Sequence, residues 1–431
     1  MKMNLAGIGV IAAAGMMLSP MASAVESITD AFKEGKAGVS FRLRYEDVDQ
    51  PEKDMSADAL TLRSRLSFQT ADFYGVGSFI EFDNVNAWDY SNYKSGTNTG
   101  DADASTIKDP EYTQVNQAYL SYSKWDTVAK YGRQRIVLDN QRFIGNVGFR
   151  QNEQTYDAFS VTNKSVKNLS IFAAKVFNVN TIVNDGEGDA SDTVTGTVRG
   201  DDKKSDHLLL NVQYKVFDPL TITGYAYNLD NIVSEDTVDT RDTVGLRLTG
   251  TVPAGPVKIG YTAEFAAQEY ENEADGTKNY EADYSLLEAS VAVVGVTVKL
   301  GNELLGADDT DAAGTAFNSF QTPLATLHAH NGWADMFLAT PANGLNDTYL
   351  SVGGTIPGEV NITGVFHTYT ADEEAATGED DLGDEFDLIV SRKFGAYGVE
   401  FKYASYSEGD AVFAPAYTET EKFWITATAD F

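Results

Sequence analysis

Apolar and polar residues alternate in short segments along this chain, and this alternation restricts the possible folds more than any other feature of the sequence. In segment 39–46 every second residue is apolar, and the residues between are Ser40, Arg42, Arg44 and Glu46. Successive side chains of a β-strand point to opposite faces, so such a segment predicts a strand with one apolar and one polar face. Eighteen segments of this kind can be counted.

The connections between these segments alternate between short and long. The short ones are made of turn-forming residues, such as Asp218-Pro219 and Gly395-Ala396, whereas most of the long ones are acidic. Eight short and nine long connections predict an all-β, antiparallel, up-and-down transmembrane barrel of about 18 strands, with short periplasmic turns and long extracellular loops. The eighteen predicted strands are 39–46, 60–69, 75–84, 112–123, 127–138, 154–163, 168–180, 207–216, 220–230, 242–252, 257–268, 284–294, 295–305, 346–356, 359–370, 384–394, 397–407 and 420–431.

The first 24 residues predict the cellular compartment. Lys2 precedes an apolar run from Leu5 to Leu18, and the small residues Ala22-Ser23-Ala24 follow, which is typical of a secretory signal peptide cut before Val25. Beyond residue 24 no stretch has the ~20 consecutive apolar residues of a spanning helix. We therefore expect a signal peptide at 1–24 and a single barrel domain at 25–431, in the outer membrane of a Gram-negative bacterium.

The net charge of the chain restricts the partners that it can bind. The chain has 32 Lys and Arg against 64 Asp and Glu, a net charge of −32, which argues against nucleic acid. The expected partners are the lipid bilayer and lipopolysaccharide, the latter through divalent cations held by the acidic loops. The last segment, 420–431, is apolar on one face and ends at Phe431, a pattern that resembles the terminal signal read by the barrel assembly machinery.

The polar faces of the strands predict the character of the lumen. Arg42, Arg44, Arg63 and Arg65 come from neighbouring strands and are expected to face one sector of the lumen, and closure of the ring is expected to bring Lys422 beside them. The opposite sector is expected to carry Glu264 and Glu288, with Glu303 close by. These positions predict a field across the pore, from a basic wall to an acidic one, and guanidinium groups suit carboxylate solutes.

No arrangement typical of an enzyme is present. The four histidines are scattered, apart from His328 and His330, whose spacing in a strand would place both rings on one face, as in a metal site. No cysteine accompanies them, and the acidic residues are distant in sequence. We expect no catalytic residues, no cofactor and no metal.

Two motifs resemble the alginate export family of outer-membrane porin-like proteins. The first comprises 132–136 (GRQRI) and 142–158 (RFIGNVGFRQNEQTYDA), and the second comprises 320–327 (FQTPLATL) and 331–335 (NGWAD). The resemblance implies an 18-stranded monomer with an electropositive channel that inward-folded loops partly close. It also implies substrate contact by Arg133, Arg135, Arg142 and Arg150, with Asp157 as a pairing acid.

Strand alternation alone leaves the direction of Arg133 and Arg135 open. If both face the lumen, then Lys130 and Gln134 face lipid, unless a β-bulge intervenes. The resulting hypothesis is a channel for hydrophilic, anionic solutes such as uronate poly- or oligosaccharides. The alternative is an outer-membrane receptor or adhesin whose barrel displays its loops.

Overall fold

The computed structural model describes residues 25–51, 56–88, 92–95, 104–183, 193–194, 197–198, 204–234, 237–272, 279–308, 318–413 and 416–431. One short helix, α1 (Ile28–Lys33), precedes the strands. Among the described residues, no helix is long and apolar enough to cross a membrane. The strands are β1 (Lys36–Asp49), β2 (Ala57–Gln69), β3 (Val76–Ala87), β4 (Tyr112–Lys124), β5 (Thr127–Gln134), β6 (Thr155–Asn163), β7 (Leu169–Asn180), β8 (Thr193–Val194), β9 (Thr197–Val198), β10 (Lys204–Phe217), β11 (Leu220–Ser234), β12 (Thr237–Ala254), β13 (Val257–Asn272), β14 (Tyr280–Val293), β15 (Val296–Leu305), β16 (Ala307–Asp308), β17 (Asn318–Ser319), β18 (Leu345–Ile356), β19 (Val360–Thr370), β20 (Asp381–Phe394), β21 (Tyr397–Ser407) and β22 (Thr420–Asp430).

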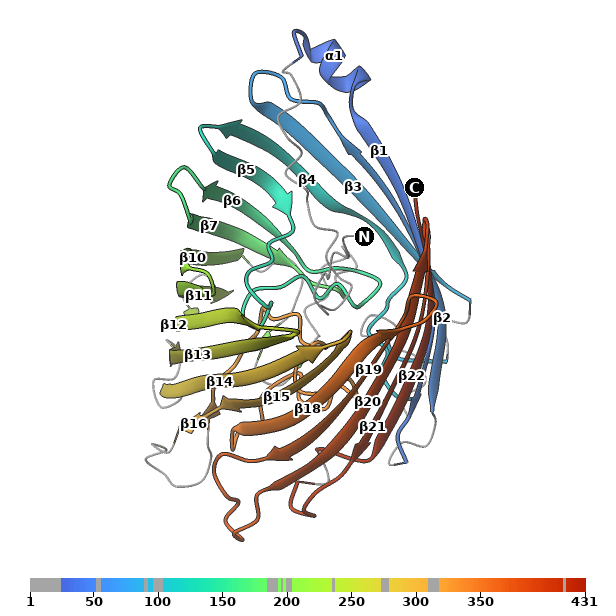
Figure 1. Ribbon diagram of the computed structural model, residues 1–431, viewed down its shortest axis with the longest axis vertical. Helices are drawn as coiled ribbons and strands as arrows, with labels where there is room; N and C mark the ends of the chain where they lie inside the picture. Colours follow the sequence, from blue (N-terminus) through green and yellow to red (C-terminus); the bar gives the residue numbers. More distant parts are fainter. Residues whose placement is uncertain are drawn as a thin grey trace.

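Eighteen of these strands form one closed antiparallel sheet, which confirms the predicted barrel. Each strand pairs with the next along the chain, and β1 also pairs with β22, so the two lie side by side (Figure 1). The pairs β8–β9 and β16–β17 form separate two-stranded ribbons. Closure gives the backbone groups at both edges of the sheet a partner, as the hydrocarbon core requires.

The alternation in the sequence becomes an inner and an outer face. In β1, Arg42, Arg44 and Glu46 are buried on the inner face, whereas Phe41 and Leu43 on the outer face are 39% and 38% exposed. The other strands follow the same pattern: Leu208 and Leu210 of β10, for example, are exposed on the outside. These apolar side chains form the surface that faces lipid.

Several observed strand bounds differ from the predicted ones by a few residues, and two cases show the causes. The strand predicted at 127–138 ends at Gln134, because the chain then turns into the barrel, where Arg135 N donates to Gln117 Oε1 at 3.0 Å. Figure 1 shows this segment, in teal between β5 and β6, inside the ring of strands. The connection between β11 and β12 was predicted to be long, but only residues 235–236 separate the two strands, since their pairing continues to Ser234 and Thr237.

Gly132 allows β5 to lie close to β4 just before this turn. Its φ is +125°, and a Cβ there would lie 2.3 Å from Ala118 O. We therefore expect Gly132→Ala to lower the free energy of unfolding by about 2–5 kcal/mol, because the strained backbone conformation and the overlap of the new Cβ with Ala118 O both cost free energy. Urea unfolding in lipid vesicles measures this loss.

Gly255→Ala is the matched control. Its φ is also positive, at +65°, but no heavy atom lies within 4 Å of the added Cβ, so the expected loss is about 1 kcal/mol. Equal losses in the two variants would contradict the close approach at Gly132.

Candidate functional site: the inner segments and the charged lumen

Among the described residues, two long connections fold into the lumen and meet each other there. We call residues 135–154, between β5 and β6, the first inner segment, and residues 320–344, between β17 and β18, the second inner segment. They are hydrogen-bonded to each other, since Gly145 N donates to Leu324 O at 2.8 Å and Thr326 N donates to Gln141 O at 3.0 Å. The two segments therefore form one unit that narrows the lumen.

Aromatic side chains join this unit to the inner face of the barrel. The ring of Phe143, in the first inner segment, lies 5.1 Å from Tyr225 of β11 and 5.3 Å from Tyr284 of β14. Phe320, in the second inner segment, lies 5.5 Å from Tyr284. Burial of these rings stabilises the inward position of both segments.

Arg42 and Arg44 face the lumen as predicted, but the first inner segment covers them. Arg42 Nε donates to Gln151 Oε1 at 2.8 Å and Arg42 Nη1 donates to Gly148 O at 2.9 Å, while Arg44 Nη1 donates to Phe149 O at 2.6 Å. These acceptors are neutral. Among the described residues, neither arginine forms an ion pair, so both positive charges lack a paired carboxylate.

Arg63 and Arg65 of β2 also face the lumen, and they share Glu153 with Arg135. Arg65 Nη1 donates to Glu153 Oε1 at 2.8 Å, Arg135 Nε donates to Glu153 Oε2 at 2.7 Å, and an Arg63 nitrogen lies 3.9 Å from Oε1. Arg65 also donates two hydrogen bonds of 2.6 Å to the carboxylate of Asp83. Burial tends to raise the pKa of Glu153, but the three arginines outweigh it and hold that pKa well below its ordinary value.

A second group of ion pairs ties both inner segments to the barrel. Arg150 Nη1 donates to both oxygens of Glu46 at 3.0 and 2.9 Å, and Arg150 Nη2 donates to Asp335 Oδ2 at 3.1 Å. Lys422 of β22, predicted to join the basic wall, lies 3.2 Å from the same Asp335 oxygen. Asp335 therefore links the second inner segment to the first and to the wall.

Phe149 lies where the two segments meet β1, β21 and β22. Its ring stacks on His328 with 3.5 Å between ring centroids, and the cationic groups of Arg44 and Lys402 lie 4.1 and 4.7 Å from its centroid. The ring of Trp424 meets it edge-on at 5.7 Å. The Phe149 ring thus makes cation–π contacts with cations from two strands, β1 and β21.

The acidic side of the lumen differs from the prediction. Glu264 and Glu288 do face inward, but Glu264 is ion-paired with Arg247, its neighbour in register on β12, and Glu288 with Lys299 at 2.7 Å. Arg142 lies 2.9 Å from Glu303, which also accepts a hydrogen bond from Asn331 at 2.8 Å. The predicted acidic wall is therefore wrong as a bare negative surface, because bases on adjacent strands and on the first inner segment neutralise it.

Arg133 and Asp157 lie outside the lumen, which corrects the assignment of these two residues as pore-lining. They pair in register across β5 and β6, with Arg133 Nε to Asp157 Oδ1 at 2.9 Å. Both share a face with Phe159, which is 44% exposed on the outside, whereas Gln134 is buried on the inner face. Strict alternation holds along β5, so the side chain of Gln134 faces the lumen and that of Arg133 faces outward. Arg135 lies beyond the strand and reaches Glu153.

His328 and His330 do not form a metal site with other side chains: within the described residues, no three His, Cys, Asp or Glu side chains could hold a metal ion. His328 instead has a structural place. Its Nδ1 lies 2.6 Å from Asp335 Oδ1 and its Nε2 lies 2.6 Å from Lys402 Nζ. Because Lys402 can only donate, Nε2 accepts and Nδ1 carries the hydrogen that is donated to Asp335.

Sequence reasoning missed several functional partners. Arg247, Glu153 and Lys402 were not selected, although strand alternation places Arg247 and Lys402 on inner faces. Glu153 falls within the first motif, so its position in the motif was the available signal. Its contacts with three arginines depend on how the first inner segment folds back.

Comparison with known proteins identifies the family. Residues 35–304 match the model of the alginate export family, a match that includes the first motif and ends before the second. The chain belongs to the alginate export family. A comparison with curated protein sequences finds no match.

Solved structures share the fold of this alginate export family member. OpdL of Pseudomonas aeruginosa superimposes with a TM-score of 0.66 at 14% identity, covering 93% of this chain and 99% of that chain. OccK9 (OpdG) of the same organism gives 0.68 at 13% identity, with the same coverage. OccAB1 of Acinetobacter baumannii gives 0.66 at 13% identity, covering 94% and 98%. Family and fold together make this chain a porin-like channel of the Gram-negative outer membrane.

Replacement of Glu153 tests whether its ion pairs keep the first inner segment in the lumen. Glu153→Gln leaves the buried arginines around it without their shared carboxylate, so we expect the free energy of unfolding to fall by about 3–5 kcal/mol. We also expect a larger and noisier single-channel current. The exposed Glu408 serves as control, since Glu408→Gln should change neither quantity. A variant Glu153→Gln with the current and stability of the wild type would contradict this account.

The environment of His328 predicts a dependence of stability on pH. Burial, with Lys402 beside it, holds the pKa of His328 well below the ordinary value of 6.5. Near this pH the His328 imidazole therefore binds a proton in the unfolded chain but stays neutral in the folded chain. The free energy of unfolding should then fall as the pH is lowered through about 6.5. Urea unfolding between pH 8 and 5 should show this fall, and His328→Gln should reduce it. An equal slope in the two proteins would show that His328 is not responsible.

Proposed function

We propose that this chain is a passive channel for hydrophilic, anionic solutes such as uronate poly- or oligosaccharides. The observation that carries the proposal is the state of Arg42 and Arg44, which are buried at the narrowed part of the lumen, donate to neutral oxygens of the first inner segment and of Thr426, and form no ion pair among the described residues. In a confined, water-filled path such charges raise the local concentration of anions.

The other inward arginines support the same solute class indirectly. Arg63, Arg65, Arg135, Arg142 and Arg150 hold the inner segments in place through carboxylates. Their role in the proposal is to set the width of the path and the position of the free charges. The solute itself passes through the part of the lumen that the inner segments leave open, and it contacts the walls there.

The proposal includes the setting of the channel in the membrane. The sheet closes within one chain, which supports a monomer. The outward residues of the last strand, including Phe423 and Ile425, with Phe431 at the end of the chain, support recognition by the barrel assembly machinery during insertion. Acidic extracellular connections suit divalent cations that bridge to lipopolysaccharide.

The selectivity should depend on Arg42 and Arg44. We expect wild-type channels in planar bilayers to prefer anions, and the double variant Arg42→Gln, Arg44→Gln to move the reversal potential towards that of a non-selective pore, because two unpaired charges are lost. Arg133→Gln removes the same charge from the outer face and should leave the reversal potential unchanged. Liposome swelling with uronate oligosaccharides of increasing size reports the transport itself.

Three results would overturn the proposal. These are a cation-selective wild type, a reversal potential that the double variant leaves unchanged, and the absence of swelling with any saccharide. A shift in Arg133→Gln as large as that in the double variant would assign the selectivity to net charge rather than to the lumenal arginines.

A further inference from the structure

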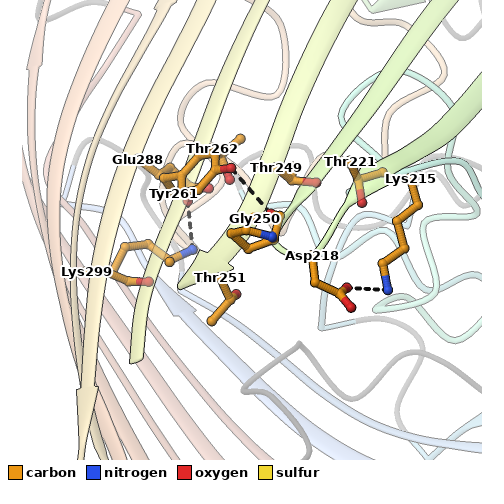
Figure 2. A pocket seen from close by; sticks show the side chains of 13 residues that line it. Lys215, Asp218, Thr221, Thr249, Gly250, Thr251, Tyr261, Thr262, Glu288 and Lys299 are labelled. Atoms are coloured by element: carbon orange, nitrogen blue, oxygen red, sulfur yellow. Dashed lines mark hydrogen bonds and ion pairs between the residues drawn. The ribbon is translucent and has the colours of Figure 1, made fainter. Parts of the chain in front are cut away.

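A cavity of about 480 Å³ lies against the inner face of the barrel at the end of the short turns (Figure 2). It extends from Lys215 of β10 and the following turn at Asp218 to Lys299 of β15. The inner segments lie elsewhere in the lumen, and none of their residues lines this cavity. It is therefore separate from the inner segments, and the Glu288–Lys299 ion pair is what it shares with the charged groups described above.

The inward residues that line the cavity follow the register of the sheet. Lys215 pairs with Thr221, Thr221 with Thr249, Thr249 with Thr262, and Thr262 with Glu288. Five neighbouring strands, β10 to β14, thus contribute one row of polar side chains in which three successive members are threonines. Since adjacent strands lie about 4.8 Å apart, the row spans roughly 19 Å, the length of several sugar rings.

A second row runs beside the first, closer to the short turns. Thr251 pairs with Gly260, Gly260 with Ser290, and Ser290 with Lys299. Gly260 has no side chain, and this leaves room for the Ser290 hydroxyl, because a Cβ at Gly260 would lie 2.4 Å from Ser290 Oγ. The two rows together present hydroxyl groups around a depression in the wall.

A lysine lies at each end of this surface. Lys215 is ion-paired with Asp218, and their side chains are 51% and 84% exposed. Lys299 is ion-paired with Glu288, and its side chain is 41% exposed, so both ammonium groups remain open to the lumen. Glu288 is also held by Tyr349, whose hydroxyl donates to it at 2.7 Å.

This combination suits one class of ligand. A hydroxyl can donate one hydrogen bond and accept others, so a row of hydroxyls matches a molecule that itself carries many hydroxyl groups. The ammonium groups at the ends favour carboxylates. Solvent-exposed ion pairs such as Lys215–Asp218 are weak, so a ligand carboxylate can compete for the lysine.

We propose that this surface is a binding subsite for sugar acids, in which Thr221, Thr249, Thr262 and Ser290 hydrogen-bond the ring hydroxyls and Lys215 and Lys299 attract the carboxylates. It rests on the proposed function, since it assigns a place in the lumen where the anionic saccharide is held. The subsite lies at the periplasmic end of the path, before or after the narrowed part according to the direction of transport.

Single-channel recordings with oligogalacturonate as a reversible blocker test the subsite. We expect the double variant Thr249→Val, Thr262→Val, which keeps side-chain shape but removes two hydroxyls, to shorten the blocked time about tenfold, since each hydrogen bond contributes modestly. Thr363→Val removes an inward hydroxyl of β19 outside the cavity and should leave the blocked time unchanged. Heat-modified mobility in gel electrophoresis checks that all variants fold as barrels.

The lysines are tested with a matched neutral saccharide. Lys215→Met should shorten the blocked time of oligogalacturonate several-fold and leave that of a malto-oligosaccharide of equal length unchanged. If both the double threonine variant and Lys215→Met fold and show the wild-type blocked time with oligogalacturonate, the subsite is overturned and the channel function stands. A wild type that oligogalacturonate neither blocks nor crosses overturns the proposed function, and the subsite with it.

Discussion

The requirement that every backbone polar group find a partner inside a membrane governs this structure. β1 and β22, the first and last strands of the large sheet, meet this requirement by pairing with each other. The remaining design follows from closure. An 18-stranded ring encloses more space than its own side chains can fill, so segments of the chain must enter it if the path is to be narrow.

The narrowing is achieved with charge as well as with apolar contacts. A buried arginine is costly unless it is paired or hydrogen-bonded, and the inward arginines of β1 and β2 obtain their partners from the first inner segment, from β3 and from β22. The segment in turn uses these cations, because Arg65 donates to Glu153, and Arg42 and Arg44 donate to the carbonyl groups at 148–150. Wall and segment therefore stabilise each other.

The sequence predicted the fold well because strand alternation is local. It placed eighteen strands and the inward direction of Arg42 and Arg65. It failed for contacts between residues distant along the chain. The ion pair of Arg142 with Glu303, for example, joins the first inner segment to β15, and no local pattern encodes that meeting. The outward direction of Arg133 follows from uninterrupted alternation at Lys130 and Gln134, so the motif, rather than the strand pattern, misdirected the assignment.

The early end of β5 has a consequence for motion. Gln134 of β5 and Tyr156 of β6, which flank the first inner segment, are neighbours in the sheet, so the segment is tethered to the wall on both sides. A tethered segment that loses its contacts stays at a high effective concentration near them. Its release would therefore be followed by rapid rebinding, and openings of the lumen at this point would be brief interruptions of a mostly occupied state.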